Sequence, residues 1–208
     1  MSSKDRILAR IRRAASGPDA EIPRDYLTVH GSRTPAESAD LLAANLTEYR
    51  ATVHRTDEDG LPLLLARLIS PHDTVLVPPG LPPHWLSAAD TTRIPDRAAS
   101  TPAELDRVGA VVTGCALAVA ETGTIVLDGS PDQGRRRITL VPDHHVCVVR
   151  VPGQVVDSVP QALLRLDPAR PLTWISGPSA TSDIELDRVE GVHGPRTLDV
   201  VLLHTDAQ

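Results

Sequence analysis

Short apolar runs alternate with helical patterns through the first half of the chain. A helix is predicted at residues 36–49, because Leu41, Leu42 and Leu46 recur at helical spacing, and another at 61–69, which is apolar and rich in Leu. Strands are predicted at residues 51–55 and 74–77, the second being a β-branched run that stops at two prolines. Because strands that alternate with helices form parallel sheets covered by helices, the pattern predicts an α/β fold with a parallel sheet flanked by helices.

The second half of the chain is richer in strands. One further helix is predicted at 159–166, and Thr101, Pro102 and Glu104 form a capping box that opens another. The apolar runs expected to form strands are 110–113, 124–127, 138–141, 146–151, 172–175 and 198–203. We therefore expect an additional strand-rich part beside the parallel sheet.

The N-terminal segment differs from the rest. Residues 1–35 are expected to form a helix, capped by Ser2 or Ser3, and a connecting loop rich in Pro, Gly and charge. This Arg-rich amphipathic helix also has the character of a transit peptide, although a surface helix is the simpler interpretation. Residues 36–208 are expected to form a single α/β domain.

Composition excludes several classes of function. The 208 residues include two Trp, two Tyr and no Phe, so the core must be aliphatic, and a base-stacking nucleic-acid surface is not expected. The net charge of −6 also disfavours a nucleic-acid partner. No apolar run reaches 18 residues, so no membrane span is predicted.

Cysteine usage limits the cofactors. Cys115 and Cys147 are the only cysteines, whereas an iron–sulfur cluster normally takes four thiolates. We expect no iron–sulfur cluster and no metal on this chain, and the identity of any other cofactor stays unknown. Two isolated cysteines in apolar runs suit a reducing cytoplasm, which is the expected location.

The first candidate site is the sequence Ala-Glu-Thr-Gly-Thr at residues 120–124. Glu121 lies among apolar residues, which favours a raised pKa and a role as base or nucleophile. Gly123 allows a ligand to approach the backbone, and the hydroxyls of Thr122 and Thr124 can donate to an anion. The alternative is a tight turn whose Glu121 pairs locally.

The second candidate site follows the predicted strand at 172–175. Gly177, Ser179, Thr181 and Asp183 lie in a run of small and hydroxyl residues that can present N–H groups to an anion. The alternative is a capping segment that binds no ligand.

Three further features carry possible chemistry. His193 lies between glycines in the segment 191–195 and is a candidate acid–base residue, or else a turn histidine that bonds the backbone. Arg135 to Arg137 could clamp an anion, or else form a solvated face or a subunit contact. His144 and His145 should point to opposite faces of a strand, which argues against their joint binding of a metal.

Three segments in this order, 120–124, 177–185 and 191–195, resemble the LUD-domain family of lactate utilisation proteins. The resemblance implies a fold related to ribose-5-phosphate isomerases and CoA-transferases. It also implies a role beside two iron–sulfur partner proteins in the oxidation of L-lactate to pyruvate. With two cysteines here, the clusters would be carried by the partner chains.

Two other functions are compatible with the same residues. One is a stand-alone enzyme, like a CoA-transferase or a sugar-phosphate isomerase, that uses Glu121 as nucleophile or base. The other is a regulatory module that binds a small anion without catalysis. A homo-oligomer is also possible in each case.

Overall fold

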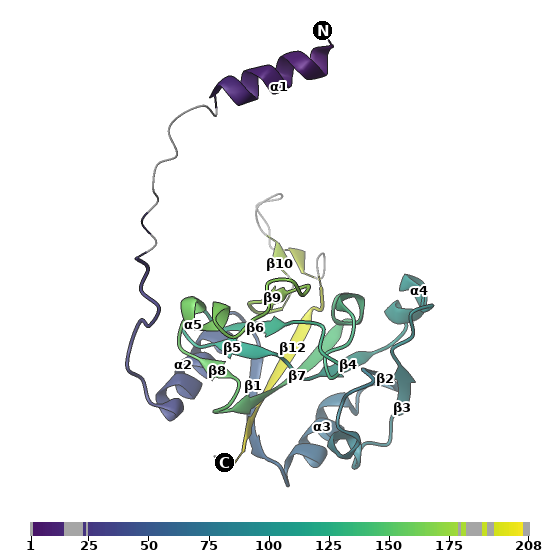
Figure 1. Cartoon of the computed structure of the whole chain (residues 1–208). Coiled ribbons are helices and arrows are strands. Elements are labelled where there is room, and N and C mark those ends of the chain that lie inside the picture. Colours follow the sequence, from purple (N-terminus) through teal and green to yellow (C-terminus); the bar gives the residue numbers. More distant parts are fainter. Residues whose placement is uncertain are drawn as a thin grey trace.

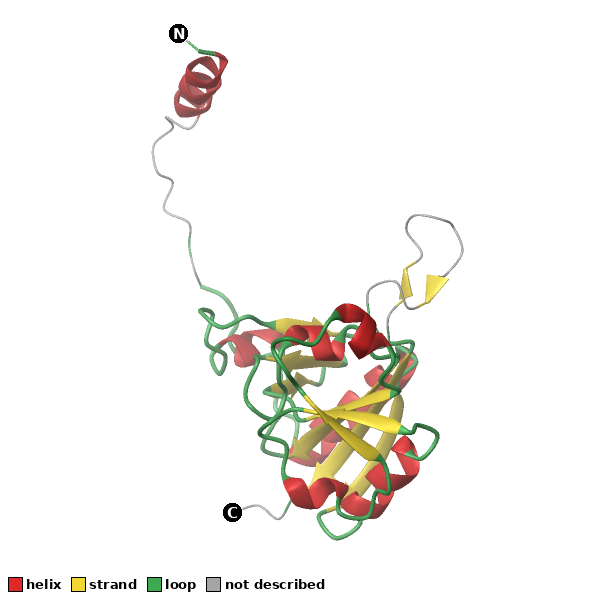
Figure 2. Ribbon diagram, turned by 90° about the vertical axis from the view of Figure 1, so that its right-hand side faces the viewer, coloured by secondary structure: helices red, strands yellow, loops and turns green. Residues whose placement is uncertain are grey.

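The computed structural model describes residues 2–14, 23, 25–178, 180–181, 189–190 and 194–205. Helix α1 (Ser3–Ala14) buries none of its residues and stands apart from the rest of the protein in Figures 1 and 2. Its apolar side chains, Ile7, Leu8 and Ile11, are exposed. Across the described part of the chain, the helices are too short or too polar to cross a membrane.

A six-stranded sheet forms the centre of the molecule (Figure 1). Every neighbouring pair of its strands is parallel. In spatial order the strands are β1 (Thr52–Asp57), β12 (Thr197–His204), β7 (His144–Val151), β4 (Ala110–Thr113), β2 (Thr74–Val77) and β3 (Thr92–Pro95). The predicted α/β fold with a parallel sheet flanked by helices is therefore confirmed.

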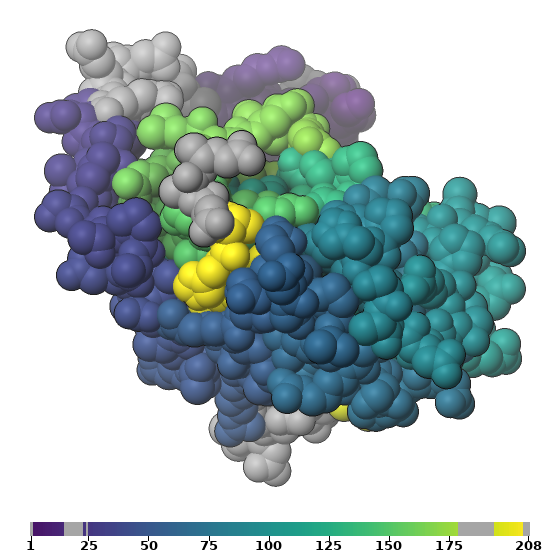
Figure 3. Space-filling view, turned by 90° about the horizontal axis from the view of Figure 1, so that it is seen from below, coloured from purple at the N-terminus to yellow at the C-terminus, as the bar shows by residue number. Residues whose placement is uncertain are grey.

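Helix α3 (Leu61–Ile69) covers one face of this sheet, together with the short 3-10 helix η1 (Pro83–Leu86). Leu61, Leu65 and Ile69 recur every four residues, so they lie on one side of α3 and are fully buried. Blue-to-teal atoms of the chain from β1 onward occupy the lower and right-hand part of the view in Figure 3.

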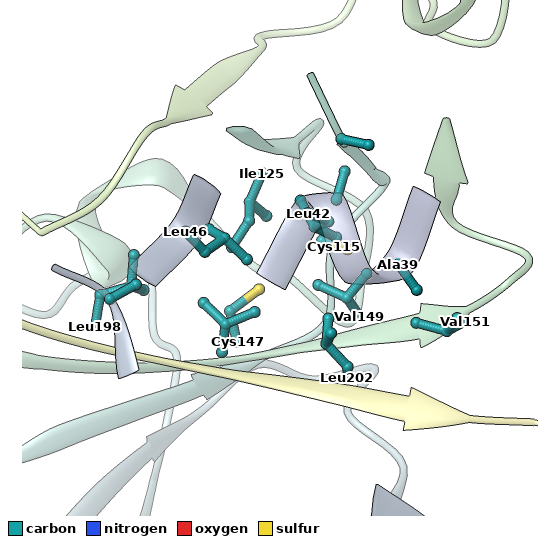
Figure 4. Packing of buried hydrophobic residues seen from close by; sticks show 14 of the residues in the cluster. Ala39, Leu42, Leu46, Cys115, Ile125, Cys147, Val149, Val151, Leu198 and Leu202 are labelled. Atoms are coloured by element: carbon teal, nitrogen blue, oxygen red, sulfur yellow. The ribbon is translucent and has the colours of Figure 1, made fainter. Parts of the chain in front are cut away.

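The opposite face packs against α2 (Pro35–Glu48) and a smaller sheet. Figure 4 shows Leu42 and Leu46 of α2 directed toward Cys147 and Val149 of β7 and Leu202 of β12. These side chains are all completely buried. The core is thus almost entirely aliphatic, and Trp85 of η1 is the one buried aromatic side chain among the described residues.

The smaller sheet accounts for the strand-rich second half of the chain. Its order is β8 (Val155–Val156), β5 (Leu117–Val119), β6 (Thr124–Leu127) and β9 (Thr173–Ile175). Helix α5 (Val159–Leu163) contributes the buried Ala162 to a cluster on its outer side. A separate pair, β10 (Ala180–Thr181) and β11 (Val189–Glu190), is antiparallel.

The predicted capping box at Thr101 is confirmed. The Thr101 hydroxyl accepts from the Glu104 backbone N–H at 3.2 Å, and α4 (Pro102–Asp106) begins there. Helix α2 starts with the same device, formed by Thr34 and Glu37. These local bonds satisfy N–H groups that the first turn of a helix leaves without partners.

The strand predicted at 138–141 is wrong. The chain instead forms the 3-10 helix η2 (Arg136–Thr139) there. The segment is apolar because it contributes to the core, where Ile138 is fully buried against Leu76, Val111 and Leu105. A short apolar run does not distinguish a buried strand from a buried turn, which explains the error.

Candidate functional site

The segment 120–124 forms a tight turn between β5 and β6, which pair as an antiparallel hairpin. The turn lies against the C-terminal end of α2. The side-chain amide of Asn45 donates to the carbonyl oxygens of Ala120 at 2.7 Å and Glu121 at 3.1 Å. Gly123 has φ +57°, and a Cβ atom there would lie 2.8 Å from the backbone carbonyl carbon of Asn45. Only glycine fits this conformation and this close approach.

Glu121 takes part in local ion pairs. Its carboxylate lies 3.2 Å from Nδ1 of His30 and 3.5 Å from the guanidinium of Arg33. Arg33 is also 3.9 Å from the carboxylate of Asp157, which accepts a 2.5 Å hydrogen bond from the Ser38 hydroxyl. The Glu121 side chain is 27% exposed, so solvent and small solutes can reach it. Its role as nucleophile or base stays a prediction.

The first and second predicted sites are in direct contact. The Thr122 hydroxyl donates to the Thr124 hydroxyl at 2.8 Å, and the Thr124 oxygen lies 2.8 Å from the Ser176 hydroxyl. Gly177, with φ +84°, follows at a point where a Cβ atom would lie 2.4 Å from the carbonyl oxygen of Tyr49. Internal hydrogen bonds therefore engage both threonine hydroxyls, and their role in ligand binding stays a prediction.

Several predicted site residues cannot be placed in this geometry. Ser179, Asp183 and His193 lie outside the described residues. Thr181 lies in β10, where it pairs with Val189 through the backbone.

A cavity of about 190 Å³ lies beside the Ser176–Gly177 segment. Gly194 and Pro195 also line it, so the described ends of the second and third sequence segments meet at one place. Arg136 lines the cavity and has no carboxylate within ion-pair distance among the described residues. The arginines of the run 135–137 therefore differ in their partners. Arg135 binds Asp96, with its Nε donating to the two carboxylate oxygens at 3.0 and 3.1 Å.

His145 also lines this cavity, but it is neutral. Its Nε2 lies 2.8 Å from the Thr113 hydroxyl, and the side chain is almost completely buried. Burial, and to a lesser extent His144, lowers the pKa of His145 to about 3. Arg136 is therefore the cation that an anion in this cavity would meet.

A network of three histidines and one aspartate lies on the α3 side of the sheet. Asp199 is shared by Nε2 of His54 and Nε2 of His144, each at 2.6 Å. Nδ1 of His144 lies 3.0 Å from Nε2 of His72. The separate partners of His144 and His145 confirm that the two side chains point to opposite faces. Among the described residues, no group of three or more His, Cys, Asp or Glu is placed to hold a metal.

The pKa values in this network shift for identifiable reasons. Burial acts to raise the pKa of Asp199, but the hydrogen bonds from His144 and His54 outweigh it, and the pKa lies below its ordinary value. Burial, followed by the nearby His144, lowers the pKa of His72. Sequence analysis did not single out Asp199, although an acid inside the apolar run at 198–203 is a signal of a paired buried charge.

Gly123→Ala is expected to lower the free energy of unfolding by about 2 kcal/mol, because alanine is strained at this positive φ and collides with Asn45. Urea denaturation measures the change. Gly153→Ala is the matched control, since a Cβ atom there has no neighbour within 4 Å, and its effect should stay within about 0.5 kcal/mol. Equal effects of the two substitutions would contradict the tight packing of the turn.

Comparison with known proteins identifies the family. The sequence model of the LUD domain matches residues 84–203. The chain belongs to the LUD domain family. The resemblance seen in the sequence segments is thereby confirmed, and all three segments lie inside the matched range.

Related proteins match this chain over very different lengths. "Lactate utilization protein C" of Deinococcus radiodurans is 42% identical over 206 residues, which cover 97% of this chain and 95% of the relative. The protein of the same name from Bacillus subtilis is 38% identical over 101 residues, or 45% of this chain and 40% of the relative. A crystal structure of a DUF162 family protein from Deinococcus radiodurans has a TM-score of 0.71 and 38% identity, and the match covers 83% of this chain and 99% of that one.

Proposed function

We propose that this chain is the non-cluster subunit of a cytoplasmic L-lactate utilisation system, which oxidises L-lactate to pyruvate together with iron–sulfur partner proteins. The observation that carries the proposal is the 42% identity to a lactate utilization protein C over nearly the whole length of both chains. A match of that extent supports a shared role better than a match to one segment does.

The cysteines support the division of labour between this chain and its partners. Cys115 and Cys147 are the only two, and both are buried. A hydrogen bond with Cys147 and burial raise the pKa of the Cys115 thiol well above its ordinary value. Because the thiolate is the metal ligand, such a thiol is a poor one at neutral pH. In the proposal, clusters on other chains therefore carry the electrons.

The proposal is tested by removing the chain from the organism that makes it. Cell extracts without it should lose lactate-dependent reduction of an electron acceptor, and the purified full-length protein should restore that activity. Co-purification with cluster-bearing proteins, recognised by their visible absorption, would support the partnership. Full activity in the absence of this chain would contradict the proposal.

Glu121→Gln in the same extracts separates a supporting role from direct catalysis. If Glu121 is the acid, base or nucleophile, the variant should restore activity about 100-fold less well, the lower end of what general acid–base groups contribute. If Glu121 only holds the turn against His30 and Arg33, activity should survive. Glu58→Gln is the matched control, since Glu58 is half exposed and lies on the surface beside His84.

A further inference from the structure

The central sheet has one point at which the chain connections diverge. From β2 the chain runs to β3 at one edge, whereas from the adjacent β4 it runs on to β7 and then β12 toward the other edge. In open parallel sheets, ligands bind beyond the carboxyl ends of the strands at such a point. Here these ends are Val77 of β2 and Thr113 of β4.

The loop 128–134 lies across this point. The N–H of Gly80, just after β2, donates to the carbonyl of Pro131 at 2.9 Å. The N–H of Gly114, just after β4, donates to the carbonyl of Asp132 at 3.0 Å. A Cβ atom on Gly114 would lie 2.3 Å from Oδ2 of Asp132, so the glycine makes room for this carboxyl group.

A mainly polar cavity of about 310 Å³ lies beside the loop, in the size range of small-molecule sites. Several of its polar groups already have protein partners. Asp128 is 2.8 Å from Arg170, and the Gln154 amide donates to the Cys115 carbonyl at 2.6 Å. The Gln154 oxygen accepts from the backbone N–H of Arg150 at 2.8 Å. Because these groups already have hydrogen-bond or ion-pair partners, they form the walls of the cavity and have few free donors or acceptors for a ligand.

Two side chains that line the cavity, Asp132 and Arg165, can still bind a ligand. Within the described part of the chain, only Arg150 is in ion-pair distance of Asp132, at 4.0 Å, and its guanidinium also lies over the Trp85 ring. Burial raises the pKa of Asp132, although Arg150 opposes the change. Arg165 donates to the carbonyl of Gly153 at 2.7 Å, and no described carboxylate lies within ion-pair distance of it.

We propose that this cavity binds a small 2-hydroxy carboxylate, with Arg165 pairing with the carboxylate and Asp132 accepting a hydrogen bond from the hydroxyl group. Arginine presents a fork of donors that matches a carboxylate, and a carboxyl oxygen is the natural acceptor for an alcohol. The choice of a 2-hydroxy acid over other hydroxylated anions rests on the proposed function. The Arg136 cavity offers a cation too, but none of the described residues that line it carries a carboxyl group to accept a hydrogen bond from the hydroxyl.

Calorimetric titration of the full-length protein with L-lactate and with propionate, which lacks the hydroxyl, tests the proposal. Lactate should bind with a Kd on the order of 1 mM or tighter. It should bind at least about tenfold more tightly than propionate, because propionate leaves the half-buried Asp132 carboxyl group without a hydroxyl donor. Asp132→Ala should reduce this ratio to below about threefold, since both ligands then meet the same surface.

Two arginine variants decide between the two cavities. Arg165→Gln should weaken lactate and propionate alike by about tenfold or more, because it removes the pairing charge. Arg136→Gln should leave both affinities within about twofold. Thermal unfolding of each variant shows that the fold is retained, and Asp143→Ala, at a position 60% exposed, controls for the removal of an acid.

The opposite results overturn the proposal in distinct ways. Loss of lactate binding in Arg136→Gln alone would place the ligand in the other cavity. An unchanged preference for lactate in Asp132→Ala, or no saturable binding of lactate by the natural protein, would refute the site. Each of these three results leaves the proposed function intact if electron transfer in extracts still requires the chain.

Discussion

Asp199→Ala is expected to lower the free energy of unfolding by about 3 kcal/mol, the scale measured when one partner of a buried charged pair is removed. Asp199 is 7% exposed and accepts hydrogen bonds from two imidazoles at 2.6 Å. Without the carboxylate, His54 and His144 lose the acceptor that compensates their burial. Urea denaturation at neutral pH measures the loss.

Two other variants make the Asp199 experiment specific. Asp199→Asn retains one acceptor oxygen but turns an amide N–H toward the other histidine, so its effect should lie between those of alanine and the natural residue. Asp143→Ala removes an acid from the surface, and its effect should stay within about 0.5 kcal/mol. Equal losses from Asp199→Ala and Asp143→Ala would show that the network contributes nothing to stability.

Acid is expected to destabilise the protein by about 2 kcal/mol between pH 7 and pH 5 through His145 alone. The pKa of this buried imidazole is about 3 in the folded state, against an ordinary value of 6.5. Below pH 6.5 the unfolded chain therefore binds a proton that the folded chain does not, and stability falls as the pH falls. The lowered pKa of His72 acts in the same direction.

Asp199 contributes in a different pH range. Its pKa is lowered from 3.8 in the folded state, so its stabilising effect is present above pH 4 and is lost only as the pH falls further. Unfolding free energies at pH 7, 6 and 5 should therefore report the histidines. His145→Gln should flatten the profile, whereas His84→Gln, at a side chain 63% exposed, should not. An identical slope in the His145 variant would refute the assignment.

Much of the secondary structure could be predicted because it depends on neighbours in the sequence. The helical spacing of Leu61, Leu65 and Ile69 and the capping box of Thr101 and Glu104 are local patterns, and both are found in the structure. The run at 138–141 shows where this reasoning fails. The burial of Ile138 satisfies its apolar character in a 3-10 turn as well as a strand would.

The candidate site was predictable only in part. The sequence indicated that the 120–124 turn and the loop after the strand at 172–175 carry polar groups. The contact between Thr124 and Ser176 brings these two segments together. The position of Asp132 was not predictable, because its loop is held by Gly80 and Gly114, which follow two different strands. Asp199 and His54 are 145 positions apart in the chain, so no local pattern relates them.

Composition and apolar periodicity are enough to predict an α/β protein that has a largely aliphatic core and lacks the cysteines for a cluster, because both are properties of the chain alone. The order of the strands, β1-β12-β7-β4-β2-β3, was decided only by the tertiary structure. That order places the loop 128–134 over the carboxyl ends of β2 and β4 and brings His54 and His144 together on Asp199. Such contacts join residues far apart in the chain, and only the packing of helices on both faces of the sheet holds them together.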